Sequence, residues 1–304
     1  MLRSLVGSEM CIRDRNKKAY IVIDNPTSSI IPLMNTFRDN QDYEADMFVN
    51  NHEAKEIMDD NTLLVVVDTN KPSITQCEDL LYMAKMIVVL DHHRQGSDTI
   101  RNSVLSYIEP YASSASEMVA EILQYFTEGI RIRNVEADSI YAGIMIDTDN
   151  FMQKTGVRTF EAAAFLRRCG ADVTRVRKLF REDMNDYKAR GETIRNAELF
   201  RGQFAISECP SDYVDSPTVV GAQAANELLN IVGVKASFVL TEYKGVIYIS
   251  ARAIDEVNVQ IIMERMGGGG HLNMAGCQLE TVNMEGARNL LKSTLTEMQD
   301  GGEI

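Results

Sequence analysis

Three short apolar runs in the first half of this 304-residue chain each end in an aspartate. The runs cover residues 63–68, 86–91 and 142–147, and the second continues directly into a pair of histidines. Continuous runs rich in β-branched residues are typical of strands buried in a parallel sheet. Ligands of such sheets bind just outside the carboxyl ends of the strands. We therefore expect a group of polar side chains to meet at one edge: Asp68, Asp91, His92, His93 and Asp147.

Carboxylates together with a neutral imidazole are suitable ligands for Mn²⁺ or a similar divalent ion. The alternative is that each aspartate merely ends its strand, because aspartate is common in turns. One strand of this kind would favour the alternative. Three of them, one followed by two histidines, favour a metal site.

The composition limits the classes of function. The chain is 45% hydrophobic and carries a formal net charge of −13, which disfavours a protein that binds DNA, RNA or an anionic membrane surface. A nucleotide substrate remains compatible with this negative charge, because a bound metal ion can attract phosphate locally. The five cysteines are widely spaced and form no CxxC motif, so we expect reduced thiols. No apolar stretch is long enough to span a bilayer.

The pattern of elements predicts two domains, an α/β domain with a parallel sheet and then a smaller α+β domain. We place the first at residues 16–170, a helical connector at 171–199 and the second at 200–304. Residues 1–15 resemble a translated sequencing adapter, or a short tail, and are left out of the fold prediction.

The expected elements follow from hydrophobic periodicity and turn residues. In the first domain, strands are predicted at 18–24, 48–49, 63–68, 86–91 and 142–147, and helices at 28–40, 52–59, 75–84, 113–126 and from 135. Ser114 and Glu117 have the spacing of a capping box. In the second domain, strands are predicted at 204–209, 237–243 and 246–250, with a tight turn at 243–245, and helices at 218–230, 257–266 and 285–298.

The chain resembles the DHH phosphoesterase family. Asp91-His92-His93 follows a strand, and the glycine run at 267–270 with His271 and the segment 273–276 is similar to the signature of the DHHA1 domain. Three further stretches, at 107–115, 155–163 and 258–260, are similar to cyclic-di-AMP phosphodiesterases of the GdpP type rather than to RecJ exonucleases or nanoRNA/pAp phosphatases.

The resemblance implies a role for each residue of the motif. Asp68 corresponds to a carboxylate that bridges two Mn²⁺ ions, and His92 and Asp147 correspond to ligands of the second ion. Two ions held about 3.5–4 Å apart suit an in-line displacement at phosphorus. Asp91 would orient the ring of His92. His93 would donate a hydrogen bond to the phosphate, with a purely structural histidine as the alternative.

The second domain is expected to bind the substrate. Four successive glycines permit positive φ angles and let backbone N–H groups approach an anion, although a flexible hinge would have the same composition. The neighbouring His271 and Arg252 favour phosphate binding. The predicted substrate-binding residues are Arg252, Gly268, Gly269, Gly270 and His271. Ala253 stands where the resemblance implies a serine.

One departure from the family pattern lies near the amino end. The first motif of the family, His-x-x-x-Asp-x-Asp after the first strand, is not found in this sequence. We therefore expect a sheet without its first strand, an uncovered edge beside Asp68 and at most one Mn²⁺ site. The family's amino-terminal membrane helices are not found either, so this part is expected to be cytoplasmic, without membrane contact, and could form a homodimer.

The function implied is hydrolysis of cyclic-di-AMP to pApA in bacterial signalling, by a metal-dependent phosphodiesterase. Because the first motif is lacking, we expect this copy to be weakly active or inactive. Two alternatives remain: a non-catalytic nucleotide-binding fragment, and an oligoribonuclease or pAp phosphatase on the same scaffold.

Overall fold

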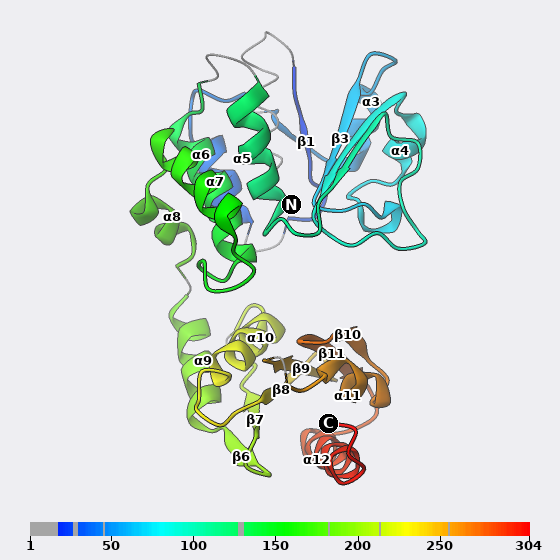
Figure 1. Ribbon diagram of the computed structural model, residues 1–304, viewed down its shortest axis with the longest axis vertical. Helices are drawn as coiled ribbons and strands as arrows, with labels where there is room; N and C mark the ends of the chain where they lie inside the picture. Colours follow the sequence, from blue (N-terminus) through cyan, green and yellow to red (C-terminus); the bar gives the residue numbers. More distant parts are fainter. Residues whose placement is uncertain are drawn as a thin grey trace. The chain divides into compact units, whose positions relative to one another are not determined.

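The computed structural model describes residues 18–26, 30–44, 46–126, 131–181, 183–212, 214–254 and 256–304. The adapter-like residues 1–15 and the start of the helix predicted at 28 lie outside these ranges. The chain divides into two compact units, Met1–Arg181 and Glu182–Ile304, and the division falls inside the connector predicted at 171–199 (Figure 1). Among the described helices, none combines the length and the apolar character that crossing a membrane requires.

The first unit contains two groups of parallel strands. β1 (Ile21–Val22) pairs with β2 (Phe48–Val49), and a second sheet has the order β3 (Leu63–Val67), β4 (Met86–Asp91), β5 (Leu105–Ile108). The registers Val67↔Leu90 and Asp91↔Ile108 align the carboxyl ends of the three strands. The chain therefore leaves β3, β4 and β5 at the same edge, as predicted for β3 and β4. The sequence analysis did not find β5.

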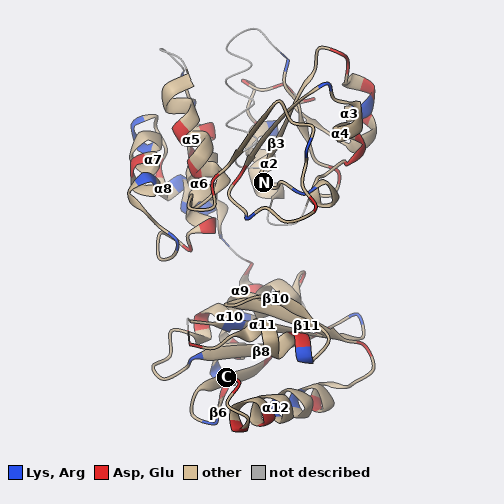
Figure 2. Cartoon of the chain, turned by 45° about the vertical axis from the view of Figure 1, so that its right-hand side comes forward, with Lys and Arg blue, Asp and Glu red and all other residues tan. Residues whose placement is uncertain are grey.

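Helices cover both faces of the β3–β4–β5 sheet (Figure 1). Leu81 packs with Val66 and Ile87 on one face, whereas Val67 and Leu90 pack against helical residues on the other. Charged residues are concentrated on helices and loops, and few lie on the strands (Figure 2). The helices of this unit are α2 (Ile31–Arg38), α3 (Asn51–Ile57), the 3₁₀ turn η1 (Pro72–Ile74), α4 (Asp79–Met83), α5 (Ala115–Phe126), α6 (Asn134–Asp147), α7 (Val157–Arg168) and α8 (Val173–Leu179).

The strand predicted at 142–147 is wrong, because this run is the last part of helix α6. All residues from Glu136 to Met145 are buried. A helix buried on every side has no polar face, so its apolar residues form a continuous run like that of a buried strand. Asp147 is consequently the last residue of a helix rather than the end of a strand.

The second unit is a mixed six-stranded sheet with the order β10-β11-β9-β8-β7-β6. β7 and β8 are parallel, and the other neighbours are antiparallel. Lys244 and Gly245, with φ angles of 53° and 79°, form the predicted tight turn between β8 and β9. The elements of the second unit are α9 (Met184–Arg195), β6 (Glu198–Phe200), β7 (Phe204–Cys209), α10 (Pro217–Leu228), β8 (Ala236–Tyr243), β9 (Val246–Ala253), α11 (Val259–Arg265), β10 (Gly269–His271), β11 (Met274–Leu279) and α12 (Met284–Asp300).

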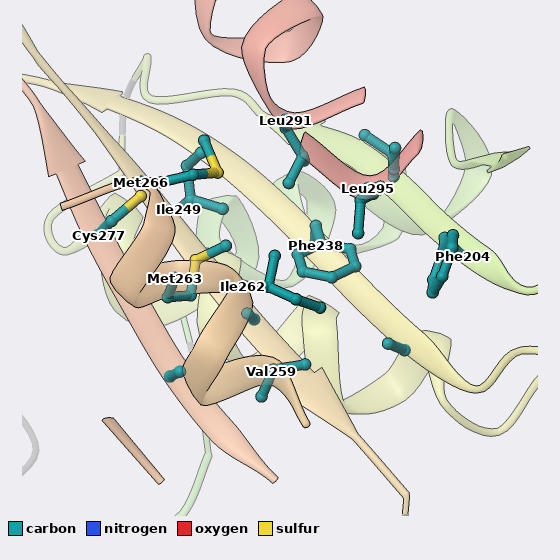
Figure 3. Close-up of a cluster of buried hydrophobic side chains, with 14 of the residues drawn as sticks. Phe204, Phe238, Ile249, Val259, Ile262, Met263, Met266, Cys277, Leu291 and Leu295 are labelled. Atoms are coloured by element: carbon teal, nitrogen blue, oxygen red, sulfur yellow. The ribbon is translucent and has the colours of Figure 1, made fainter. Parts of the chain in front are cut away.

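The main core of this unit lies between the sheet and the helices α11 and α12. Phe238 and Ile249 point from the sheet toward Ile262 of α11, and Leu291 and Leu295 of α12 complete the cluster (Figure 3). The opposite face of β7 and β8 packs against α10, where Val220 and Ala224 meet Val239. One half of that opposite face is thus occupied by a helix.

The glycine run forms part of a β-hairpin, which the sequence analysis did not predict. A Cβ atom at Gly268 would lie 2.1 Å from the carbonyl oxygen of Gly276, and one at Gly270, where φ is +148°, would lie 2.5 Å from the Cα of Ala275. Gly269 has no atom within 4 Å of its Cβ position. Packing against β11 therefore requires glycine at two of these positions, whether or not a ligand binds.

We predict that Gly268→Ala and Gly270→Ala each lower the free energy of unfolding of this unit by about 1–3 kcal/mol, because the added methyl group collides with backbone. Gly269→Ala is the matched control and should change it by less than about 0.5 kcal/mol. Chemical denaturation of the full chain measures all three. Equal effects at the three positions would contradict the packing explanation.

Candidate functional site

Asp68 follows β3 in a conformation that is unusual for a residue with a side chain. Its φ is +68°, in the left-handed region, and its N–H donates a 2.9 Å hydrogen bond to the carbonyl of Leu90. Strained backbone of this kind is often found at functional sites. The turn brings its carboxylate to the edge where β4 ends, and Oδ1 lies 3.3 Å from Nε2 of His92.

Asp68, His92 and His93 form a group suited to a metal ion. One ligand atom from each residue lies within 4.8 Å of the other two. The ring of His92 is held on its other side by the carbonyl of Ala112, 3.4 Å from Nδ1. A proton on Nδ1 would leave the lone pair of Nε2 for a cation bound beside Asp68, which is the tautomer that a metal ligand needs.

Asp91 orients His93 rather than His92, which corrects the predicted partner. It is fully buried, and its Oδ1 accepts a 2.7 Å hydrogen bond from Nδ1 of His93. Its other oxygen accepts one of 2.5 Å from Nδ2 of Asn70. Burial raises the pKa of Asp91, but the bonds from His93 and Asn70 outweigh burial, so its pKa lies below the usual value. The hydrogen bond to Asp91 is the main cause that raises the pKa of His93.

Asp147 reaches the same region from the end of α6 but is outside the group of three. Burial raises its pKa, and so does repulsion from the carboxylate of Asp68. For Asp68 the effect of burial is opposed by the hydrogen bond with His92, and its pKa is lowered. Two carboxylates that repel each other beside an imidazole are an arrangement that a divalent cation stabilises.

A buried carboxylate anchors the loop that holds His92. Glu117 of α5 accepts hydrogen bonds from the hydroxyls of Ser113 and Thr159, at 2.5 and 2.6 Å, and from the N–H of Ser113 at 3.3 Å. The predicted capping box is half formed, because the N–H of Glu117 donates to Oγ of Ser114, whereas its carboxylate binds Ser113. The carbonyl of Ala112 immediately precedes this anchored residue.

Arg158 connects three elements around the site. Its guanidinium donates hydrogen bonds of 2.7 and 2.6 Å to the carboxylate of Glu121 and one of 3.2 Å to the hydroxyl of Tyr107. It also lies 3.4 Å from the carboxylate of Glu109. Helix α7 is thus joined to α5 and to the end of β5. The sequence analysis assigned no role to Arg158 or Asn70, and it gave Glu117 only that of a capping box. The one signal for Arg158 was its place in the distinctive stretch 155–163.

In the second unit, Arg252 and His271 lie in one row on the same face of the sheet. The cross-strand pairs His271↔Met274, Met274↔Arg252 and Arg252↔Ser237 define the row. Ser237 donates a hydrogen bond to the carbonyl of Ala225 in α10, so the row faces the side of that helix. His271 of β10 and Met274 of β11 are exposed, because α10 packs on this face over β7 and β8, at the other side of the sheet.

Small residues lie beside this row. The pairs Gly269↔Gly276 and Gly276↔Ser250 place three residues with little or no side chain on the same face. Arg252 is half-buried, and burial lowers its pKa. Its Nε has no hydrogen-bond partner among the described residues. A guanidinium above a flat, glycine-rich surface is suited to a phosphate.

Comparison with known families identifies both units. Residues 16–144 match the DHH family, N-terminal domain, and residues 204–297 match the DHHA1 domain. The cyclic-di-AMP phosphodiesterase GdpP of Bacillus subtilis (strain 168) is 41% identical over 303 residues, which is 98% of this chain and 46% of the relative. The cyclic-di-AMP phosphodiesterase PdeA of Listeria monocytogenes (serotype 1/2a, strain 10403S) is 39% identical over 93% of this chain and 43% of the relative.

The chain therefore spans about half the length of the curated relatives it matches. Among solved structures, an exopolyphosphatase-related protein from Bacteroides fragilis superimposes with a TM-score of 0.81 over 98% of this chain and 88% of that chain. The two sequences are 20% identical, so this likeness shows the fold alone.

We predict that Asp91→Asn lowers the pKa of His93 toward its ordinary value of about 6.5, because the hydrogen-bonded carboxylate is what raises it. Titration of the ring protons by NMR, with a chelator present, measures the shift. Asn70→Ala is the control, since it removes a neutral partner of Asp91 and should move the pKa of His93 less. An unchanged pKa in Asp91→Asn would contradict the pairing.

Proposed function

We propose that this chain, which belongs to the DHH family and contains a DHHA1 domain, is a metal-dependent phosphodiesterase that hydrolyses cyclic-di-AMP to linear pApA. The observation that carries the proposal is that Asp68 and His92 lie 3.3 Å apart where the parallel strands end, with His93 beside them. The names of the two relatives supply the substrate class.

The donor set fits a divalent ion, for which we propose Mn²⁺. Asp68 and His92 point at each other, and Asp147 is close enough to repel Asp68. These three residues would hold the ion, and a carboxylate and imidazole set is one that Mn²⁺ accepts. When bound, such an ion polarises a phosphoryl oxygen and the attacking water.

The remaining residues are assigned to orientation and substrate binding. We assign His93 to donate a hydrogen bond to the phosphodiester, because Asp91 raises its pKa and so keeps it protonated at higher pH. Asp91 holds that ring through Nδ1, leaving Nε2 for the substrate. We assign Arg252 and His271 to bind a phosphate of the dinucleotide, and Gly269 to provide the flat surface beside it.

We expect the purified chain, which lacks the first motif of the family, to release pApA from cyclic-di-AMP only slowly in the presence of Mn²⁺. Asp68→Asn should reduce this rate at least ~100-fold, because a lost metal ligand forfeits several kcal/mol of transition-state stabilisation. Chromatography of the products measures the rate. His52→Ala is the control, since that side chain is 82% exposed in another part of the unit.

Three results would contradict this proposal. Faster hydrolysis of pAp than of cyclic-di-AMP would favour a pAp phosphatase. Tight dinucleotide binding without turnover would favour a non-catalytic module. Turnover that survives both a chelator and Asp68→Asn would exclude the metal site as its origin.

The substrate surface is tested separately from the chemistry. We predict that Arg252→Ala weakens binding of cyclic-di-AMP at least ~10-fold, because hydrogen bonds to charged groups contribute about 1.5–3 kcal/mol. Calorimetric titration with a chelator present measures binding alone. The exposed Arg265, which pairs with Glu303, gives the control Arg265→Ala, which should leave affinity unchanged. Equal affinities in both variants would rule out the assigned surface.

A further inference from the structure

The loop that follows Asp147 contains three successive residues with a left-handed backbone. Asp149, Asn150 and Phe151 have φ angles of 46°, 57° and 66°. Aspartate and asparagine tolerate this conformation, whereas it is unfavourable for a bulky residue such as phenylalanine. Each such residue costs about 1–3 kcal/mol, and strain of this kind is found mainly at functional sites. The position of Phe151 is therefore the feature that this turn maintains at a cost.

A buried threonine holds the turn in place. The hydroxyl of Thr148 donates a 2.6 Å hydrogen bond to the carbonyl of Ile144 in α6 and accepts one of 3.0 Å from the N–H of Phe151. The carbonyl of Thr148 accepts from the N–H groups of Met152 and Gln153, both at 2.9 Å. The left-handed turn is thus fixed to the end of α6 by side-chain and backbone bonds together.

The turn inserts the ring of Phe151 between two other aromatic rings. Its centroid lies 5.6 Å from that of Tyr141 in α6, at an interplanar angle of 58°, and 5.9 Å from that of Phe160 in α7, at 23°. Tyr141 is buried, Phe151 is half-buried and Phe160 is 55% exposed. The three rings therefore lead from the core of the unit to its surface. Because Phe151 covers one face of the Phe160 ring, the exposed area belongs to its other face and its edge.

The exposed ring belongs to a segment that is tied to the candidate metal group at both ends. Thr159, the preceding residue, donates a 2.6 Å hydrogen bond to Glu117, which anchors the loop that holds His92. At its other end the segment begins at Asp147, whose carboxylate is repelled by that of Asp68. A ligand whose phosphate lies at the metal group would therefore have its neighbouring parts beside the start of α7.

The chemistry of this surface selects the part of a ligand that it can bind. A phenyl ring has no hydrogen-bonding group for a phosphate or a ribose, whereas a nucleobase stacks on it with about 1–3 kcal/mol per base. The exposed side chains of Met152 and Val157, at 79% and 75%, add apolar contacts nearby. The ring of Phe160 is already held by Phe151, so a base binds without first ordering it.

We propose that Phe160 stacks on one purine base of the substrate, and that the strained turn at 149–151 serves to hold its ring through Phe151. The inference rests on the proposed function, which supplies a dinucleotide with two purines. Stacking recognises the area of the fused rings and not their hydrogen-bonding groups. Phe160 therefore favours purine over pyrimidine dinucleotides without distinguishing adenine from guanine.

Tryptophan fluorescence tests the contact directly, because the chain contains no tryptophan. Phe160→Trp introduces a single indole, whose fluorescence a stacked base quenches. We expect saturable quenching by cyclic-di-AMP with a chelator present, and none by ribose 5-phosphate, which has no base. Tyr82→Trp is the matched control, because Tyr82 is 77% exposed on α4, at the opposite face of the sheet. Its fluorescence should not respond to either ligand.

Affinity provides a second measurement that needs no fluorophore. Phe160→Ala should weaken binding of cyclic-di-AMP at least ~5-fold in a calorimetric titration, whereas Phe160→Tyr, which keeps the ring, and Tyr82→Ala should leave it unchanged. The unaltered chain should bind linear pApA more tightly than pUpU, and Phe160→Ala should reduce this difference. Lower thermal stability of Phe160→Ala with unchanged affinity would show that protein, and not a base, covers the ring.

Absence of quenching in Phe160→Trp, equal quenching in Tyr82→Trp, or unchanged affinity in Phe160→Ala would each overturn the inference. Because the chelator prevents metal-dependent turnover, these results do not depend on hydrolysis. Quenching in a chain that releases no pApA would contradict the proposed function and support the stacking contact.

Discussion

The candidate site of the first unit depends on the backbone conformation of one residue, Asp68. A left-handed conformation costs a residue with a side chain about 1–3 kcal/mol, and here it is held by the hydrogen bond to Leu90 of the adjoining strand. This turn directs the carboxylate back along the sheet edge toward His92 instead of into solvent. The register of β3 and β4 brings the side chains of Asp68 and His92 together. The pairing of the two strands therefore holds Asp68 in its strained backbone conformation.

The histidines are held by different means, and this separates their chemistry. His92 faces a neutral carbonyl, that of Ala112, and presents its other nitrogen to Asp68. His93 faces a buried carboxylate, Asp91, which favours the protonated ring. Adjacent residues of the same type are thus held in different electrostatic surroundings. The buried Glu117 supports the first arrangement by fixing the loop that carries Ala112.

In the second unit, glycine serves two purposes in one short hairpin. Gly268 and Gly270 allow the backbones of β10 and β11 to approach closely, whereas Gly269 lies on the side of Arg252 and leaves the surface flat. A half-buried guanidinium needs an anionic or polar partner, and the described residues provide none to Nε of Arg252. The close backbone packing at Gly268 and Gly270 and the unsatisfied Nε of Arg252 therefore occur in the same part of one sheet.

The sequence alone determined the α/β and α+β classes of the two units, the strands that end at Asp68 and Asp91, and the family, because buried parallel strands and strand-end carboxylates have local signatures. Local patterns could not place Asp147, since a helix buried on all sides has the apolar run of a strand. They also could not assign the partner of Asp91 or reveal Asn70 and Glu117, whose contacts join residues that are distant in the chain. The tertiary structure alone decided these, because hydrogen bonds between elements depend on how helices and strands pack and not on their own sequences.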